Sequence, residues 1–358
     1  MKRTLNVSGA ELVNADCLEM MAGMQEGSVD LIVTDPPYFR VKPEGWDRQW
    51  HGDEDYLDWL EKCLEAFARI LKPEGSLYLF CGHRLSADIE IMMRNHFNVL
   101  NHIVWAKPYG RWNGCSKQSL RSYFPATERI LFAESYPGPV RGGGDPYQKR
   151  CSALRAGIMA PLIHYFRHAR EQAGISVSEI VRRTGKQSAA HWFSKQQWYL
   201  PVEDDYRTLC ELFAEAARVN GKASLLTQDG GLLSSRYKEL CIEYKACSEK
   251  LKALRRYFSV SVTVPYTDVW TYPPVGYYVG KHPCEKPAEM LRDIILASSR
   301  PGELVADFFM GSGSSIKAAL RCGRRALGVE LEYERFAITV SEIENMSLLV
   351  EKGATARE

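Results

Sequence analysis

Short apolar runs alternate with a long amphipathic segment in the first third of the chain. The runs at 11–16 (ELVNAD), 28–35 (SVDLIVTD) and 76–82 (SLYLFCG) have the length and composition of buried strands. Between the last two runs, apolar residues recur at helical spacing and fall on one face, namely Leu57, Leu60, Leu64, Phe67, Ile70 and Leu71. This alternation of strand and helix predicts an α/β sheet.

The strand–helix rhythm continues, stops and then returns near the end of the chain. After residue 82 we expect a helix near 84–96 and strands over 97–108 and 127–135. The rhythm then stops, with a loop over 136–150, short helices over 161–217 and one long helix over 234–258. From about residue 303 it returns as a strand, a helix (314–322) and a further strand. We therefore predict an α/β domain split into 1–140 and 261–358, with a helical insert at 141–260.

The composition excludes several classes of protein. The chain has 358 residues, of which 45% are hydrophobic and 25% charged, as in ordinary soluble domains. It has no apolar stretch long enough to cross a membrane and no signal-peptide core at its start, so we expect a cytoplasmic protein with no membrane partner. Its 10 cysteines contain no C-x-x-C pair. This pattern predicts reduced thiols, with neither a disulfide framework nor a zinc site.

Positive charge is concentrated in the middle of the chain. Residues 141–200 contain ten Lys or Arg and three Asp or Glu, a local net charge of +7, whereas the whole chain carries +2. A basic segment in an otherwise slightly acidic protein suggests a polyanionic partner. An ordinary solvated surface is the alternative, and charge alone does not exclude it.

The motif D-P-P-Y at 35–38 directly follows an apolar run that is expected to be a buried strand. Ligands of open α/β sheets bind at the carboxyl ends of the strands. There, the Asp35 carboxylate and the Pro36 carbonyl are hydrogen-bond acceptors, Pro37 fixes the backbone, and Tyr38 offers a flat face. These groups fit a flat ring that carries an amino group.

Two strong acceptors would activate such an amine. The lone pair of an aromatic amine is delocalised into the ring, which makes the nitrogen a poor nucleophile. Two hydrogen bonds from the amine favour a pyramidal nitrogen with a localised lone pair. A strand-ending turn is the alternative, since Asp and Pro are common in turns. The adjacent aromatic residue and the motifs below favour the binding site.

A glycine-rich turn between a predicted strand and a predicted helix is a second candidate site. In DFFMGSGSS (307–315), Gly311 and Gly313 let the backbone approach a ligand closely. The segment has no lysine in the P-loop position. Glu330 and Asp16 end other predicted strands, and an acid at such a position suits a ribose diol. The pattern favours a nucleoside-containing cofactor without a pyrophosphate.

At these motifs the sequence resembles the amino-group DNA methyltransferases that use S-adenosylmethionine. D-P-P-Y at 35–38 resembles their catalytic motif in its adenine-type form, and DFFMGSG at 307–313 resembles their cofactor motif D-P-F-x-G-x-G. KHPCEKP at 281–287 and NADCLEM at 14–20 are similar to two further family segments. The order, with the catalytic motif before the cofactor motif, is that of the family's β-class and is similar to solitary prophage enzymes.

The resemblance implies a Rossmann-like methyltransferase sheet with permuted motif order and assigns roles to the motif residues. The implied catalytic residues are Asp35, Pro36, Pro37 and Tyr38. The implied cofactor-binding residues are Asp16, Cys17, His282, Lys286, Asp307, Phe309, Gly311, Ser312, Gly313 and Glu330. No metal is implied. The sequence departs from the family pattern at three places: Phe308 replaces the usual Pro of the cofactor motif, Ser315 replaces a Thr, and Cys284-Glu285 replaces a Thr-Gln pair. We expect activity to be retained despite these departures.

The resemblance makes the helical insert the target-recognition region. Within 167–213 the sequence also looks like a repressor-type helix-turn-helix, with a capping box at Ser176 and Glu179. The turn would be 184–186 and the recognition helix 187–196. The candidate DNA contacts are Lys186, Gln187, Ser188, His191, Lys195 and Gln196. A plain helical packing unit is the alternative.

The sequence thus predicts a DNA adenine methyltransferase that acts on a base flipped out of double-stranded DNA. The alternatives are a cytosine 4-amino enzyme, an RNA adenine enzyme, single-stranded DNA as the substrate, or a DNA-binding regulator with an inactive catalytic domain. Intact D-P-P-Y and G-x-G motifs argue against the regulator. A monomer and a homodimer are equally compatible with the sequence.

Overall fold

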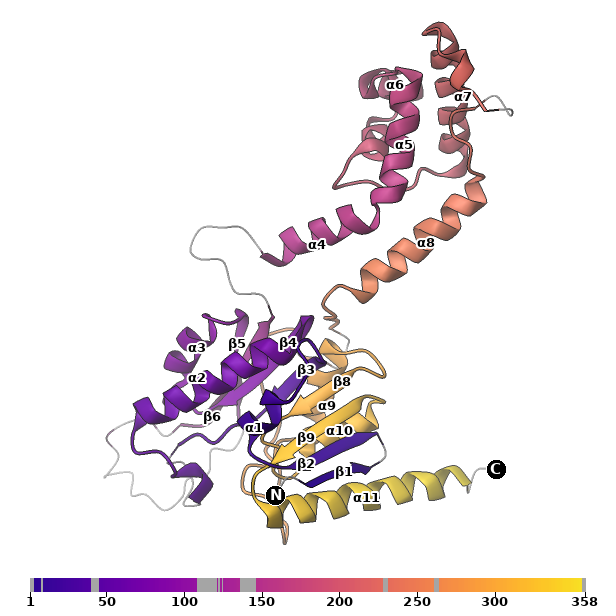
Figure 1. Ribbon diagram of the computed structural model, residues 1–358. Coiled ribbons are helices and arrows are strands. Elements are labelled where there is room, and N and C mark those ends of the chain that lie inside the picture. The colour runs from indigo at the N-terminus through magenta and orange to yellow at the C-terminus, as the bar shows by residue number, and fades with distance from the viewer. Residues whose placement is uncertain are drawn as a thin grey trace. The chain divides into compact units, whose positions relative to one another are not determined.

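A computed structural model describes residues 3–7, 9–39, 45–107, 121, 123, 125–135, 146–227, 231–260 and 264–355. The chain divides into two compact units (Figure 1). Unit 1 combines residues 1–142 with 256–358, and unit 2 comprises residues 143–255. No helix in the described part of the chain is long and apolar enough to cross a membrane.

Unit 1 is built on one nine-stranded sheet with the order β1-β2-β9-β8-β3-β4-β6-β5-β7. Strands β2, β9, β8, β3 and β4 are parallel, whereas β1 and β6 run antiparallel to their neighbours. The strands are β1 (Arg3–Val7), β2 (Ala10–Asn14), β3 (Val29–Thr34), β4 (Leu71–Cys81), β5 (Asn98–Ala106), β6 (Thr127–Glu134), β7 (Val269–Trp270), β8 (Leu304–Asp307) and β9 (Arg325–Glu330). The predicted α/β sheet is confirmed.

Helices cover both faces of this sheet. Successive residues of a strand point to opposite faces, so Ile32 packs on one face while Leu31 and Val33 pack on the other. The first face is covered by α1 (Cys17–Ala22), α2 (Asp53–Ile70) and α3 (Ser86–Met93), and the second by α9 (Ala288–Ser298), α10 (Ser314–Arg321) and α11 (Tyr333–Thr355). A short 3-10 helix, η1 (Gly45–Asp47), precedes α2.

Strands β3 and β8 come from opposite parts of the chain but lie side by side at the centre of the sheet. Leu31 pairs with Val305 and Ile32 with Ala306. All three central residues of β3, Leu31 to Val33, are completely buried, which explains their uninterrupted apolar run. The carboxyl ends of the two strands therefore meet at one edge of the sheet.

Unit 2 is helical and has its own hydrophobic core. The core contains large buried aromatic side chains, including Phe166, Trp192, Trp198 and Phe213. Its elements are α4 (Pro146–Ile158), α5 (Ala160–Ala173), α6 (Val177–Thr184), η3 (Gln187–Phe193), α7 (Glu203–Val219), η4 (Ala223–Leu225) and α8 (Tyr237–Ala253).

The predicted recognition helix over 187–196 was wrong in type and in length. Ser176 caps α6 by accepting the Glu179 N–H at 3.1 Å, and Gly185 ends α6 in the left-handed conformation, as the motif requires. The next segment is a 3-10 helix that stops at Phe193. With three residues per turn, this helix puts Ala189 and Trp192 on the same buried side.

Candidate active site

The D-P-P-Y motif and the glycine-rich turn face one another across a single pocket of unit 1. The Thr34 hydroxyl, at the end of β3, donates to Asp307 Oδ1 at 2.8 Å and accepts the Phe308 N–H at 3.1 Å. These bonds tie together the two chain segments that leave β3 and β8. The residues from this edge that line the pocket include Asp35, Pro36, Pro37, Tyr38, Asp307, Phe309, Gly311, Ser312 and Glu330.

Asp35 lies in the wall of this pocket, and both of its carboxylate oxygens are engaged. The Tyr38 hydroxyl donates to Oδ1 at 2.6 Å, and the Lys286 ammonium donates to Oδ2. Burial raises the pKa of Asp35, although the Lys286 charge opposes that effect. Burial and the Asp35 charge also hold the pKa of Tyr38 well above its usual value, so this phenol stays neutral.

The backbone of the motif is held in place from α2. The Tyr56 hydroxyl donates to the Pro37 carbonyl at 2.8 Å. Pro36 lines the pocket, and no described residue donates a hydrogen bond to its carbonyl. Phe39, the next residue after the motif, has a φ of 56° although it is not a glycine. Its ring is buried between Trp50 and Tyr56, and this packing sustains the strained backbone.

Two glycines shape the turn between β8 and α10. Gly311 has a φ of +47°, and a Cβ there would lie 3.0 Å from the His282 ring. Its carbonyl accepts the Thr339 hydroxyl at 2.7 Å and Arg335 Nε at 3.1 Å. Gly313 has a φ of +68° and is the N-cap of α10, but it does not line the pocket. The turn is thus fixed against α11.

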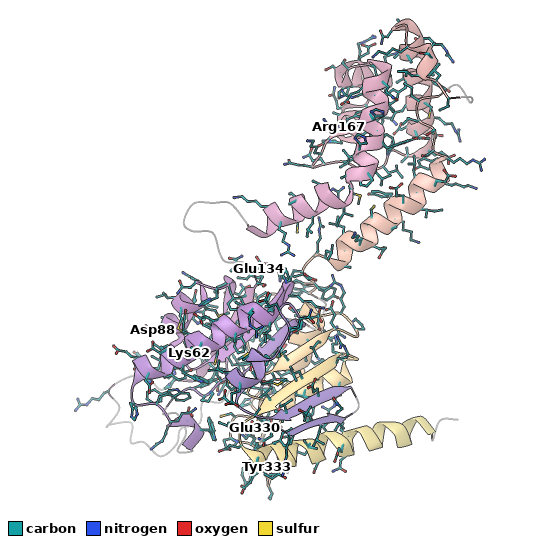
Figure 2. The ribbon with its side chains drawn as sticks, viewed as in Figure 1. Lys62, Asp88, Glu134, Arg167, Glu330 and Tyr333 are labelled. Atoms are coloured by element: carbon teal, nitrogen blue, oxygen red, sulfur yellow. The ribbon has the colours of Figure 1, made fainter. Side chains whose placement is uncertain are left out.

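Two further acidic residues, Glu330 at the end of β9 and Asp16 before α1, line the same pocket. Glu330 ends β9, next to the start of α11 at Tyr333 (Figure 2). Its oxygens accept the N–H groups of Gly311 at 3.0 Å and Glu332 at 2.9 Å, and burial raises its pKa. The sequence predicted that Asp16 ends a strand, but β2 stops at Asn14. Asp16 instead caps α1, accepting the N–H groups of Leu18 and Glu19.

Asp307 supports the turn rather than facing the solvent. Its side chain accepts hydrogen bonds from Thr34 and from the Phe309 N–H at 3.1 Å. Burial raises its pKa to about 6, partly offset by these hydrogen bonds. The residue is only 3% exposed. This carboxylate therefore links the two central strands beneath the pocket.

The structure brings most of the predicted site residues together. The pocket is lined by every residue of the predicted catalytic set and by nine of the ten predicted cofactor-binding residues, Gly313 being the exception. Cys17 lies in its wall at the start of α1, and His282 stacks on Trp46 with ring centroids 6.4 Å apart. Lys286 differs from its predicted surroundings, because its ammonium pairs with Asp35 in the catalytic motif.

Several pocket residues carry no local sequence signal and were missed. Trp46, Trp59 and Arg335 line the pocket, and Trp59 lies with its ring centroid 5.6 Å from that of Phe309. Glu128 of β6 reaches the Asp35 motif by accepting the Tyr38 hydroxyl at 3.3 Å. Glu128 stands between Thr127 and Arg129 at the polar start of the strand TERILFAE, so its sequence position gave no hint of this contact.

The candidate DNA contacts all lie in unit 2, at or after the end of α6. Lys186, Gln187, Ser188, Lys195 and Gln196 are exposed, whereas His191 is half-buried. Lys186 is paired with Asp205 of α7. Lys195 and Gln196 follow η3 rather than belonging to a helix. Trp192 and Phe193 are buried.

Comparisons with known proteins agree with this geometry. A family model described as DNA methylase (N6_N4_Mtase) matches residues 29–341. The DNA adenine methyltransferase YhdJ of Escherichia coli (strain K12) is 23% identical over 327 residues, covering 90% of this chain and 79% of that protein. The type II methyltransferase M2.DpnII of Streptococcus pneumoniae is 22% identical over 351 residues, covering 93% and 89%.

One solved structure extends the comparison to the fold. The PvuII DNA methyltransferase, which is cytosine-N4-specific, aligns with a TM-score of 0.50 at 14% identity, covering 95% of this chain and 93% of that one. The likeness shows that the sheet of unit 1 is of the methyltransferase type, as predicted.

Proposed function

Because the chain belongs to the DNA methylase family, we propose that it transfers the methyl group of S-adenosylmethionine to the 6-amino group of adenine in DNA. One observation carries this proposal. The D-P-P-Y segment after β3 and the glycine-rich turn after β8 line the same pocket, so an amine and a cofactor can lie next to each other there. Relatives named as adenine methyltransferases support the choice of base.

The pocket offers groups that fit the cofactor. When bound, S-adenosylmethionine supplies an electrophilic methyl group on a sulfonium, so the reaction itself calls for no metal. Glu330 would accept hydrogen bonds from the ribose diol, since each carboxylate oxygen has a second lone pair beside its backbone N–H partner. Asp16 and Cys17 would face the adenine, and Phe309 offers a ring. His282, Ser312 and Gly311 would close the wall.

The catalytic motif would orient the target amine. Asp35 and the Pro36 carbonyl would accept hydrogen bonds from its two N–H groups, which directs the nitrogen lone pair toward the methyl group. Tyr38 presents its ring to the base while its hydroxyl holds Asp35. A base inside a duplex cannot reach Asp35, so the target adenine must be flipped out of the helix.

We further propose that unit 2 supplies part of the DNA-binding surface. Its basic residues favour a phosphate backbone, and its exposed side chains after α6 could reach base edges. Double-stranded DNA is the proposed substrate form, with single-stranded DNA or RNA as alternatives, and the enzyme would act as a monomer or a homodimer.

Nucleoside analysis tests the proposed function. Purified protein is incubated with S-adenosylmethionine labelled in the methyl group and with matched DNA and RNA, and the products are digested to nucleosides. We expect label in N6-methyl-2′-deoxyadenosine from DNA. Label in N4-methyl-2′-deoxycytidine would instead identify the cytosine activity, and label from RNA alone would reassign the substrate. Absence of label, with DNA still bound, would support the inactive regulator.

A further inference from the structure

Behind the catalytic motif lies a group of charged side chains that the motif itself does not include. Lys286, in the segment before α9, donates to Asp35 Oδ2 and lies 3.5 Å from Glu128 Oε2. Glu128 also pairs through Oε1 with Lys107, which follows β5. The Lys286 side chain is 8% exposed, that of Asp35 16% and that of Glu128 19%. Four largely buried charges, two of each sign, therefore form one connected network.

The Tyr38 hydroxyl links the two carboxylates of this network. It donates to Asp35 Oδ1 at 2.6 Å and lies 3.3 Å from Glu128 Oε2. Lys286 Nζ also lies 5.4 Å from the centroid of the Tyr38 ring and 5.1 Å from that of Phe80. An ammonium in contact with two aromatic faces and two carboxylates is held from several sides at once. Its position leaves little freedom to the Asp35 carboxylate.

We propose that Lys286 and Glu128 are positioning residues for the catalytic carboxylate, with Lys286 holding Asp35 ionised and oriented and Glu128 holding Lys286. This inference rests on the proposed function, because it assigns a role in amine activation. It places Lys286 with the catalytic motif instead of with the cofactor. Glu128, from a strand that carries no family motif in this sequence, becomes part of the same machinery.

The two partners act on Asp35 with opposite sign. An ionised Asp35 accepts hydrogen bonds from the amine, so activity is lost as pH falls through its pKa. The Lys286 charge lowers this pKa, whereas the Glu128 charge raises it. Attraction by the two acids more than offsets burial and raises the pKa of Lys286, and the two lysines lower the pKa of Glu128 against the effect of burial.

Other titratable groups around Asp35 could also affect the pH–rate profile. They are Tyr38 of its own segment, Cys81 at the end of β4, Tyr56 of α2 and Asp307 of β8. The pKa values of Cys81 and both tyrosines are raised by burial, so these groups stay neutral near pH 7. Asp307, with a pKa of about 6, would add an acid limb of its own. Neither Lys286 nor Glu128 is among the causes of the shift in the pKa of Asp307, so substituting them should not act through Asp307.

The test compares pH–rate profiles of four variants on saturating DNA and cofactor. For Lys286→Met we expect kcat at neutral pH to fall about tenfold or more, and the acid limb to move to higher pH by about one unit, as for the removal of an opposite charge. For Glu128→Gln the limb should move to lower pH. Lys286→Arg, which keeps the charge, should restore the limb toward that of the natural protein. The Kd for S-adenosylmethionine should be unchanged in all three.

A matched control exists at the amino end of β3, the strand whose carboxyl end leads to Asp35. Lys72 pairs with Asp30 of β3, at 2.5 Å, but neither residue lines the pocket. Lys72→Met should leave the pH–rate profile unmoved. Circular dichroism and thermal melting of each variant show whether it is folded, and limbs are compared only among folded variants. If Lys286→Met does not fold, the comparison of Glu128→Gln with Lys286→Arg decides the inference alone.

Three outcomes would overturn the inference. Acid limbs that move in the same direction for Lys286→Met and Glu128→Gln would exclude opposite electrostatic effects on Asp35. A weakened Kd for the cofactor with an unmoved limb would return Lys286 to the cofactor site. An unmoved limb for Glu128→Gln would reduce Glu128 to a structural residue. Failure of the proposed function is distinct, because the natural protein itself would then methylate no DNA.

Discussion

At the residue scale, the place of the D-P-P-Y motif in the pocket could be predicted because its chemistry is contiguous in sequence. Asp35, Pro36 and Tyr38 are neighbours, and the acceptors they offer are read directly from their side chains and backbone. Glu128 and Lys107 could not be found this way. Glu128 reaches Tyr38 and Lys286 because β6 lies next to β4, which pairs with β3, and Lys107 joins the group by pairing with Glu128. No local pattern encodes that strand order. The pairing of Lys286 with Asp35 joins residues 251 positions apart.

The first residue-scale prediction concerns Asp35. Asp35→Ala removes one of the two acceptors for the amine but leaves the turn after β8 intact. We expect turnover to fall by about a hundredfold or more, the usual cost of removing a transition-state interaction of this kind. Cofactor affinity, measured by calorimetry, should stay close to that of the natural protein. Near-normal turnover in the variant would contradict the assignment.

The second concerns Glu330. Its carboxylate is the group best placed for the ribose diol, and it also braces the Gly311 and Glu332 N–H groups. Glu330→Ala should weaken cofactor binding by about 1–3 kcal/mol, as for the removal of a charge-assisted hydrogen bond. Calorimetric titration measures this directly. Glu330→Gln is the matched control, since an amide keeps one acceptor and should lose less affinity. Unchanged binding in both variants would place the ribose elsewhere.

At the element scale, the segments with a regular apolar pattern were predictable, whereas the predicted recognition helix was not found. The spacing over 55–71 predicted α2, and the run at 28–35 predicted β3, because burial of one face leaves a regular pattern. The recognition helix failed for a physical reason. Trp192 and Phe193 must both be buried close after the turn at Gly185, and a short 3-10 helix achieves this where a longer α-helix was expected.

The element-scale prediction concerns the start of α10. Gly313 and Gly323 both have positive φ, of +68° and +71°. An alanine at either position would incur about 1–2 kcal/mol of left-handed strain. At Gly313 the new Cβ would also lie 2.6 Å from Thr339 Cγ2, whereas at Gly323 nothing lies within 4 Å. Gly313→Ala should therefore lower the free energy of unfolding more than Gly323→Ala. Urea denaturation without cofactor measures both, and equal losses would contradict the packing argument.

At the scale of the whole molecule, the split of the α/β domain was visible in the sequence because its strand–helix rhythm stops and returns. The joining of its halves was not visible in detail. Strand β2 pairs with β9 from the far end of the chain, and β1 was not expected at all. A strand's partner depends on long-range packing that periodicity does not report. Unit 2 shows the same limit, since its aromatic core brings together Phe166, Trp198 and Phe213 from separate segments.

The last prediction separates two lysines of unit 2 that the sequence had treated alike. A plot of log affinity against log salt concentration has a negative slope, and removing one lysine–phosphate ion pair reduces the magnitude of that slope by about one unit. Lys195 is exposed, whereas the Lys186 ammonium is already paired with Asp205. Lys195→Ala should therefore flatten the salt dependence by about one unit, and Lys186→Ala by less. Asp205→Asn should steepen it, because the substitution frees the Lys186 charge for a phosphate. Binding isotherms over a salt series measure all three slopes, and turnover on saturating DNA should stay largely preserved. Unchanged slopes in every variant would mean that these helices only pack and that DNA lies along another face.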